Sequence, residues 1–319
     1  MQRFFSGEPR VTAMPHGMTK PFRLAVTALL ASLIAGCSIT APPPAQTTDP
    51  STPAPSATPT NPPSSSRPRA VSPFASLSSY VANRAGQITA ALYDKRTRKT
   101  WVFHPGVRQD TASIVKVQIM GTALWEAQQG RPLSAAKRAL MTPMIENSDN
   151  NAATELLAAV GGPSAVQRFD RRAGLYDTTP SRQKYIPGSN PPLPGWGLTT
   201  TTAFDEVRLV SRFAYPNSVL TTASRQYGLH LMKHVRSDQA WGVSGGNYGL
   251  LPGATVALKN GWLPHQLATN SDWQINSIGW VSGNGRDYVL AVLTNHNPSD
   301  TYGIATIDTI ARKIYAEFG

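Results

Sequence analysis

The chain has 319 residues and a formal net charge of +12. Its single cysteine excludes a disulfide framework and a cysteine-based structural zinc site. Hydrophobic residues make up 40% of the chain, which is enough for a sizeable core. In contrast, the 27 prolines and the charged content of only 15% indicate that part of the chain is not globular.

The N-terminal segment has the features of an export signal. Basic residues precede an apolar run over residues 24–35, which is shorter than the roughly twenty residues of a transmembrane helix. Small residues then lead to Cys37. This pattern resembles a bacterial lipoprotein signal, in which the cysteine receives the lipid and becomes the new N-terminus. The alternative is an ordinary secretory signal followed by a free thiol.

The next segment, residues 37–73, consists mainly of Pro, Ser, Thr and Ala. Such a stretch cannot bury enough apolar surface to offset the entropy of ordering it, so we expect an extended tether. The predicted organisation is therefore a signal peptide over 1–36, a tether over 37–73 and a globular domain over 74–319. The expected location is extracytoplasmic, with a lipid on Cys37 anchoring the chain to a cell membrane.

The first half of the globular domain is predicted to contain a β-hairpin and several helices. Hydrophobic periodicity predicts helices over 76–83, 114–129, 134–145 and 151–160, and hairpin strands over 88–93 and 100–103. A loop rich in Pro, Gly, Ser and Thr follows over 178–200. Ordered loops of this length in compact domains are commonly functional.

The second half is predicted to end in strands and a helix. The pattern favours helices over 202–213, 221–235 and 303–318, and strands over 255–259, 273–281 and 288–294. Strands at both ends with helices between them imply an antiparallel sheet assembled from both termini, that is, an α/β (α+β) fold with an all-helical subdomain.

One short string combines a serine and a lysine three residues apart, Ser113-x-x-Lys116. Positions i and i+3 share one face of a helix, so the lysine ammonium can reach the serine hydroxyl. A lysine whose pKa is lowered by burial can take the serine proton. The same spacing recurs at Ser134, which is typical of a helix N-cap. Only the string at Ser113 opens an apolar helix suited to burial.

Two further strings are ambiguous when taken alone. Ser148-Asp149-Asn150 lies between two predicted helices, and these residue types are typical of helix caps. Lys259-Asn260-Gly261 ends an apolar strand, where a lysine is usually solvated and a glycine can mark a bulge.

In this order, the three strings match the motif set of class A β-lactamases and penicillin-binding proteins. Residues 75–319 therefore resemble that superfamily, although Asn260 replaces the usual threonine or serine. The resemblance implies a β-lactamase/transpeptidase-like fold. It implies that Ser113 attacks a carbonyl with Lys116 as its base, and that Ser148 relays a proton to the leaving nitrogen. It also implies that Lys259 faces Ser148 and the substrate carboxylate. The residues that it implies for substrate binding are Asn150, Asn260, Gly261 and Trp262. The backbone N–H groups of Ser113 and Trp262 would form the oxyanion hole.

The sequence also departs from the class A pattern. Class A enzymes use a loop glutamate to activate the deacylating water, but no Asp or Glu occurs between Asp177 and Asp205. Without such a base, the rate of deacylation should fall by a factor of roughly 10²–10⁴. Gln183 and Tyr185 could only position a water molecule. The connection between the helices over 114–129 and 134–145 is also short, which predicts a more open cleft.

We therefore expect an exported, lipid-anchored serine acyl-hydrolase or transferase that acts on a cell-wall amide, with peptidoglycan as the partner, or on a β-lactam, and that deacylates slowly. The alternatives are a non-catalytic envelope module that binds peptidoglycan or a protein, and a β-lactamase with unusual deacylation. No cofactor, metal or nucleic-acid partner is expected. His230 and His234 have metal-ligand spacing, but no third ligand is evident in the sequence.

Overall fold

The computed structural model describes residues 72–246, 253–266 and 271–317. The predicted signal peptide, Cys37 and nearly all of the predicted tether lie outside these residues. In the part that is described, no helix is both long enough and apolar enough to cross a membrane.

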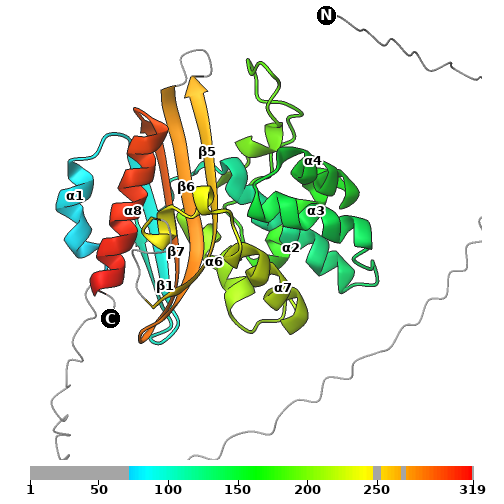
Figure 1. Ribbon diagram of the computed structural model, residues 1–319, viewed down its shortest axis with the longest axis horizontal. Helices are drawn as coiled ribbons and strands as arrows, with labels where there is room; N and C mark the ends of the chain where they lie inside the picture. Colours follow the sequence, from blue (N-terminus) through cyan, green and yellow to red (C-terminus); the bar gives the residue numbers. More distant parts are fainter. Residues whose placement is uncertain (1–71, 247–252, 267–270, 318–319) are drawn as a thin grey trace, which may run out of the picture. The chain divides into compact units, whose positions relative to one another are not determined.

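A five-stranded antiparallel sheet lies at the centre of the fold (Figure 1). Its strands are β1 (Gln87–Asp94), β2 (Lys99–Phe103), β5 (Thr255–Gln266), β6 (Ser271–Gly283) and β7 (Arg286–Asn297), in the order β2-β1-β7-β6-β5. The pairing of β1 with β7 joins the start of the globular segment to its end, which confirms the predicted assembly of the sheet from both termini. The strand β5 continues seven residues beyond its predicted end.

Helices cover both faces of the sheet. The helix α8 (Asp300–Glu317) contacts β6 and β7 on one face, whereas α6 (Ala203–Ala214) contacts β1, β6 and β7 on the other. The remaining helices are α1 (Ser78–Ala82), α2 (Val115–Ala127), α3 (Ala135–Glu146), α4 (Asn150–Ala159), α5 (Gly162–Ala173) and α7 (Thr222–Lys233). In Figure 1, α2, α3, α4 and α7 gather on the α6 side of the sheet as a helical subdomain.

The two hydrophobic cores follow from the alternation of side chains along each strand. In β7, Leu290 and Val292 belong to the core that contains α8, whereas Ala291 and Leu293 belong to the core of the helical subdomain. A strand buried on both faces is expected to be a continuous apolar run, as β7 is.

The helix α5 was not predicted from the sequence. Gly161 has a φ of 93° and closes α4, and Pro163 then occupies the first turn of α5. A glycine at the end of one helix and a proline at the start of the next are both favourable. The cluster of Gly and Pro therefore marks a junction between two helices rather than the beginning of a loop.

The predicted loop over 178–200 is mostly irregular. It includes the short helix η3 (Gly195–Leu198) and leads into β4 (Thr200–Thr201), which pairs with β3 (Gln109–Asp110) in a second small sheet. The strand β3 leads directly into the 3₁₀ turn η2 (Ala112–Ile114), which opens α2. This small sheet therefore ties the loop to the segment that carries Ser113.

Candidate active site

The three short strings come together between the sheet and the helical subdomain. Lys116 Nζ lies 3.0 Å from Ser113 Oγ and 3.0 Å from Ser148 Oγ. Lys259 Nζ, from β5, lies 3.0 Å from the same Ser148 Oγ. The amino groups of two lysines from distant parts of the chain therefore meet at the hydroxyl of Ser148, and the hydroxyl of Ser113 adjoins the amino group of Lys116.

The surroundings of Lys116 suit a neutral amine. Its Nζ donates to the carbonyl oxygen of Ser148 at 2.6 Å and to Asn150 Oδ1 at 2.8 Å. Both partners can only accept, so they occupy the two N–H bonds of an uncharged lysine. The hydroxyls of Ser113 and Ser148, both 3.0 Å from Nζ, can each donate or accept, so the lone pair of the uncharged amine can accept a hydrogen bond from the Ser113 hydroxyl or the Ser148 hydroxyl. This is the arrangement required for Lys116 to take the proton of Ser113.

The electrostatics favour the same protonation state. Burial, helped by the positive charge of Lys259, lowers the pKa of Lys116 to about 6, while the carboxylate of Asp149 partly opposes this shift. Burial alone lowers the pKa of Lys259 to about 7. Both lysine side chains are completely buried. Burial therefore favours the neutral form of both lysines.

Two residues of the site have strained backbones. Ala112, immediately before Ser113, has a φ of 46°, and Ser148 has a φ of 55°. Neither is a glycine, so each conformation costs of order 1–3 kcal/mol and persists only where the surroundings enforce it. Asp149 caps α4 by accepting from Ala152 N at 2.7 Å. The capping explanation of Ser148-Asp149-Asn150 therefore applies to the aspartate, while the flanking side chains contact Lys116.

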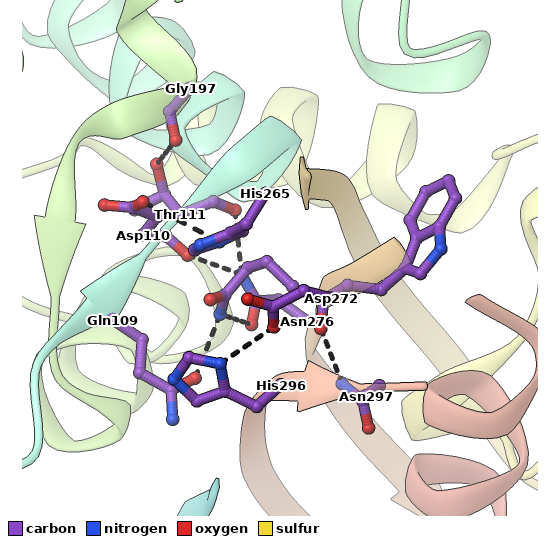
Figure 2. A network of polar contacts seen from close by, with 11 residues as sticks. Gln109, Asp110, Thr111, Gly197, His265, Asp272, Asn276, His296 and Asn297 are labelled. Carbon is purple, nitrogen blue, oxygen red and sulfur yellow. Dashed lines mark hydrogen bonds and ion pairs between the residues drawn. The ribbon is translucent and has the colours of Figure 1, made fainter. Parts of the chain in front are cut away.

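A polar network holds the segment that precedes Ser113 (Figure 2). Asn276 Nδ2 donates to the carbonyl oxygens of Asp110 at 2.8 Å and Thr111 at 3.0 Å. Thr111 N donates to Thr199 O at 2.7 Å. Asn276 is completely buried, so the network fixes the backbone of Asp110 and Thr111 from β6. Nothing in the sequence near Asn276 pointed to this contact.

Figure 2 also shows two histidines at the outer end of this network. His296 Nδ1 lies 2.8 Å from Asp272 Oδ1, and His265 Nε2 lies 3.9 Å from Asp110 Oδ2. Burial raises the pKa of Asp110, and His265 opposes this shift. The partners of these histidines are distant in the sequence, so no local spacing could reveal them. No group of three or more metal-binding side chains forms within the described ranges.

The alternation of side chains along β5 determines which residues of Lys259-Asn260-Gly261 face the site. Leu258 belongs to the α8 core and Ala257 to the core of the helical subdomain. By the same alternation, Lys259 and Gly261 face Ser113, whereas Asn260 faces away from it. Asn260 Nδ2 donates to Gln239 O at 2.7 Å, and its side chain is buried. Its side chain is not part of the cavity lining, so substrate contact by Asn260 stays a prediction that this geometry does not support.

Gly261 allows β5 to approach η2. A Cβ atom at this position would lie 2.7 Å from Ser113 N, 2.7 Å from Thr111 O and 2.9 Å from Ile114 N. All three are backbone atoms, which cannot move aside cheaply. The glycine therefore makes room for the backbone of the serine segment. Trp262, the next residue, lines the same cavity as Ser113. The substrate-binding role that the resemblance implies for Gly261 stays a prediction.

A cavity of about 220 Å³ opens beside Ser113, Ser148 and Asn150. Its walls include Ile186, Leu193, Pro194, Trp196, Gly197, Trp262, Leu263, Pro264 and Trp273. No carboxylate occurs among the described residues that line it. Gln183 and Tyr185 are not in the lining either, and the side chain of Tyr185 is 49% exposed.

Trp196 is a site residue that the sequence analysis did not identify. Lys116 Nζ lies 4.9 Å from the centre of its ring, and its Nε1 donates to Thr154 Oγ1 at 3.1 Å. The only sequence signal was its place in the long loop over 178–200. The loop was expected to be functional, but the sequence does not show which of its residues turn inward.

Comparisons with known proteins agree with this geometry. The family model described as the β-lactamase enzyme family matches residues 133–318, more than half of the chain. The matched range includes Ser148, Asn150 and Lys259 but begins after Lys116. The β-lactamase Toho-2 of Escherichia coli is 31% identical over 140 residues, which are 41% of this chain and 48% of that protein. The chain thus spans about half the length of this curated relative.

Solved structures of class A β-lactamases are similar in fold. The enzyme of the last common ancestor of Gram-negative bacteria superposes with a TM-score of 0.64 at 21% identity, over 78% of this chain and 100% of the other. A β-lactamase from Xanthomonas campestris pv. campestris gives 0.63 at 19% identity, over 77% and 97% of the two chains. The chain therefore belongs to the β-lactamase enzyme family, within the superfamily of serine β-lactamases and penicillin-binding proteins, and has the α/β fold of the class A enzymes.

Proposed function

We propose that the protein is an exported, lipid-anchored serine acyl-hydrolase or transferase that acts on a cell-wall amide or a β-lactam through an acyl-Ser113 intermediate. The observation that carries this proposal is the position of Lys116 Nζ, 3.0 Å from Ser113 Oγ and hydrogen-bonded to two groups that can only accept. The family membership supports a serine hydrolase, and the N-terminal sequence supports export and a lipid on Cys37.

The first step is acylation. Ser113 Oγ attacks the carbonyl carbon of the substrate, and its proton passes to Lys116 Nζ. The negative charge that develops on the carbonyl oxygen is stabilised by the backbone N–H groups of Ser113 and Trp262. The closeness of Gly261 to Ser113 N supports this assignment. Loss of one such donor typically costs 10²–10³-fold in kcat.

The second step is departure of the leaving group. Ser148 Oγ lies 3.0 Å from both Lys116 Nζ and Lys259 Nζ, so it can pass a proton from a lysine to the leaving nitrogen. As the carbon–nitrogen bond breaks, the amine takes this proton and the acyl group stays on Ser113. Asn150 keeps Lys116 oriented through its 2.8 Å hydrogen bond and borders the cavity that receives the acyl group.

Deacylation is slow in this account. A water molecule that attacks the acyl-serine needs a general base, and no carboxylate occurs among the described residues that line the cavity. General bases typically contribute 10²–10⁴-fold. The acyl-enzyme therefore persists, or passes its acyl group to an amine that is bound in place of water.

Active-site probes test this function. A fluorescent penicillin or an alkyl fluorophosphonate should label the wild-type chain on Ser113, and Ser113→Ala should lose the label while keeping its melting temperature. If neither reagent labels a folded sample, the chain is a binding module with a β-lactamase fold rather than an acyl-transfer enzyme.

A further inference from the structure

A second cavity lies near the β2 edge of the sheet, whereas Lys259 belongs to β5 at the other edge. One wall comes from β1, β2 and the turn between them, and the other comes from α6 and the segment that follows it. Its volume is about 380 Å³. No residue lines both this cavity and the one beside Ser113. We call it the hairpin cavity, and it is separate from the candidate active site.

The charged side chains that line the hairpin cavity are all basic. They are Lys95, Arg208 and Arg212, and no Asp or Glu occurs among the described residues of the lining. Arg208 and Arg212 are four residues apart on α6, so they share one face of the helix, where two like charges repel each other. The fold therefore collects positive charge in one cavity against this repulsion.

Little negative charge of the protein offsets this cluster. Arg208 Nη1 lies 3.9 Å from Asp205 Oδ1, but Arg212 and Lys95 form no ion pair with any described residue. Burial lowers the pKa of Arg212, and the charges of Arg208 and Arg172 lower it further. A guanidinium group nevertheless stays charged in proteins. The lowered pKa therefore marks a positive charge that a bound anion would stabilise.

The backbone at the end of α5 holds both guanidinium groups in position. Arg208 Nη1 donates to Gly174 O at 2.8 Å, and Arg212 Nε donates to Ala173 O at 2.9 Å. Each guanidinium has five N–H donors, so one hydrogen bond leaves most of them for a ligand. Because both groups are already anchored, an anion that binds them meets a lower entropic cost.

Lys95 supplies a third cation from the opposite wall. Its side chain is half-buried, and its Nζ lies 5.0 Å from the centre of the Tyr215 ring. Beyond this ring, Asp287 Oδ1 accepts from Tyr215 Oη at 2.8 Å and from Trp280 Nε1 at 2.7 Å. Asp287 does not line the cavity, and its carboxylate is already hydrogen-bonded by these two donors.

We infer that the hairpin cavity binds the phosphate group of an organic phosphate. Guanidinium forks match the oxygens of a phosphate bidentately, and the lysine adds a point charge. The aromatic rings of Tyr93, Phe204 and Tyr215 also line the cavity, so the organic part of the ligand has a surface to pack against. The ligand is a soluble phosphate ester or a phospholipid headgroup. The inference does not depend on the acylation of Ser113.

Calorimetric titration of the full chain with inorganic phosphate, at constant ionic strength, tests the inference. One phosphate should bind per chain with a Kd of about 1 mM or lower. Acetate should bind at least about tenfold more weakly, because it carries less charge for three cations to attract. Arg212→Gln and Lys95→Gln should each weaken phosphate binding at least about fivefold. Arg138→Gln and Lys313→Gln remove the same charges at exposed positions outside the lining, so they should leave the Kd unchanged.

Lys95→Gln keeps the test decisive if Arg212→Gln fails to fold, because Lys95 lies in a turn and is only half-buried. Labelling of Ser113 by fluorophosphonate should be the same in Lys95→Gln as in wild type. This readout reports the proposed function separately, so the loss of one proposal does not remove the other.

Two further ligands distinguish the sources of the phosphate. If the ligand is a soluble ester, glycerol 3-phosphate should bind more weakly to Lys95→Gln than to Lys313→Gln, and both variants should bind vesicles equally. If it is a headgroup, phosphatidylcholine vesicles that contain phosphatidylglycerol should bind Lys95→Gln more weakly than Lys313→Gln, and pure phosphatidylcholine vesicles should not.

Three results would overturn the inference. The first is phosphate binding that does not saturate, or that is no tighter than acetate binding. The second is phosphate binding that Arg212→Gln and Lys95→Gln leave unchanged. The third is binding of both glycerol 3-phosphate and vesicles that does not depend on Lys95, which would mean that the cavity holds no organic phosphate.

Discussion

Asn150 Oδ1 accepts a hydrogen bond from Lys116 Nζ at 2.8 Å, so a neutral amide oxygen occupies the position where a carboxylate would form an ion pair. The amide orients the lysine but, being uncharged, does not favour its ammonium form as a carboxylate would. This relationship explains how Lys116 can be surrounded by acceptors and still have a pKa of about 6.

Replacing this amide by a carboxylate should therefore inactivate the base at neutral pH. In the wild-type chain, the rate of Ser113 labelling by fluorophosphonate should rise with pH with a midpoint near 6, as Lys116 loses its proton. In Asn150→Asp, the new negative charge favours the ammonium form, so the midpoint should move up by more than one pH unit. Asn150→Ala serves as the control and should not raise it. Coincident pH profiles for Asn150→Asp and wild type would show that Lys116 is not the base.

Lys259 should decrease stability at neutral pH. Burial lowers its pKa to about 7 in the folded chain, whereas an unfolded lysine titrates near 10.4. Between these values the unfolded chain binds more protons, so stability rises with pH across this window and is lowest below pH 7. Lys259→Met should raise the free energy of unfolding at pH 7 by about 1–4 kcal/mol, in line with apolar replacements of other buried charges.

Urea unfolding at pH 7 and pH 9 measures this effect. The increase in stability between the two pH values should be smaller in Lys259→Met than in wild type, while the rate of Ser113 labelling falls. Lys313→Met, at an exposed position of α8, should change neither quantity. A free energy of unfolding at pH 7 that is the same in Lys259→Met as in wild type, or lower, would contradict the assignment of Lys259 as a desolvated, functional lysine.

Gly261 should tolerate no side chain. Gly261→Ala places a Cβ atom 2.7 Å from Ser113 N, so β5 must move away from η2. The expected cost is about 1–3 kcal/mol of stability, as for other overpacked sites, with at least a tenfold lower rate of Ser113 labelling. At Gly197 a Cβ atom would lie 3.8 Å from Ala112 Cα, an ordinary contact, so Gly197→Ala should keep its melting temperature. Wild-type stability and labelling in Gly261→Ala would refute the proposed reason for this glycine.

Asn276 should position Ser113 without touching it. Asn276→Ala leaves the carbonyl oxygens of Asp110 and Thr111 without these donors, at an expected cost of about 1–3 kcal/mol. The rate of Ser113 labelling should fall. The pH midpoint of labelling should stay at its wild-type value, because Lys116 sets it. His296→Ala removes an exposed member of the same network and should have little effect on labelling. A shifted pH midpoint in Asn276→Ala would mean that Asn276 acts on Lys116 instead.

The sequence was informative where local patterns determine structure. Ser134 accepts from Lys137 N and caps α3 as predicted, because a cap is a contact over three residues. The hairpin of β1 and β2 and the helices α6 and α7 begin within two residues of their predicted starts. The spacing of Ser113 and Lys116 was likewise sufficient to predict that their side chains can meet.

Contacts between distant segments were harder to predict. The orientation of Asn260 depends on which face of β5 packs against the segment of Gln239 and Trp241, and the motif alone does not show this. The partners of Asn276 and His265 come from segments more than 150 residues away. The lining of the cavity depends on how the loop over 178–200 folds back on itself, which the backbone bonds between Ile186 and Leu193 determine.

The acylation of Ser113 is tested most directly by the intact mass of the full chain after incubation with benzylpenicillin, whose ring opens on acylation so that the whole drug stays attached. We expect one adduct of the drug's mass per chain, located on Ser113, absent from Ser113→Ala and still present after free drug is removed. An unchanged mass in a folded chain, or an adduct that Ser113→Ala retains, would contradict it.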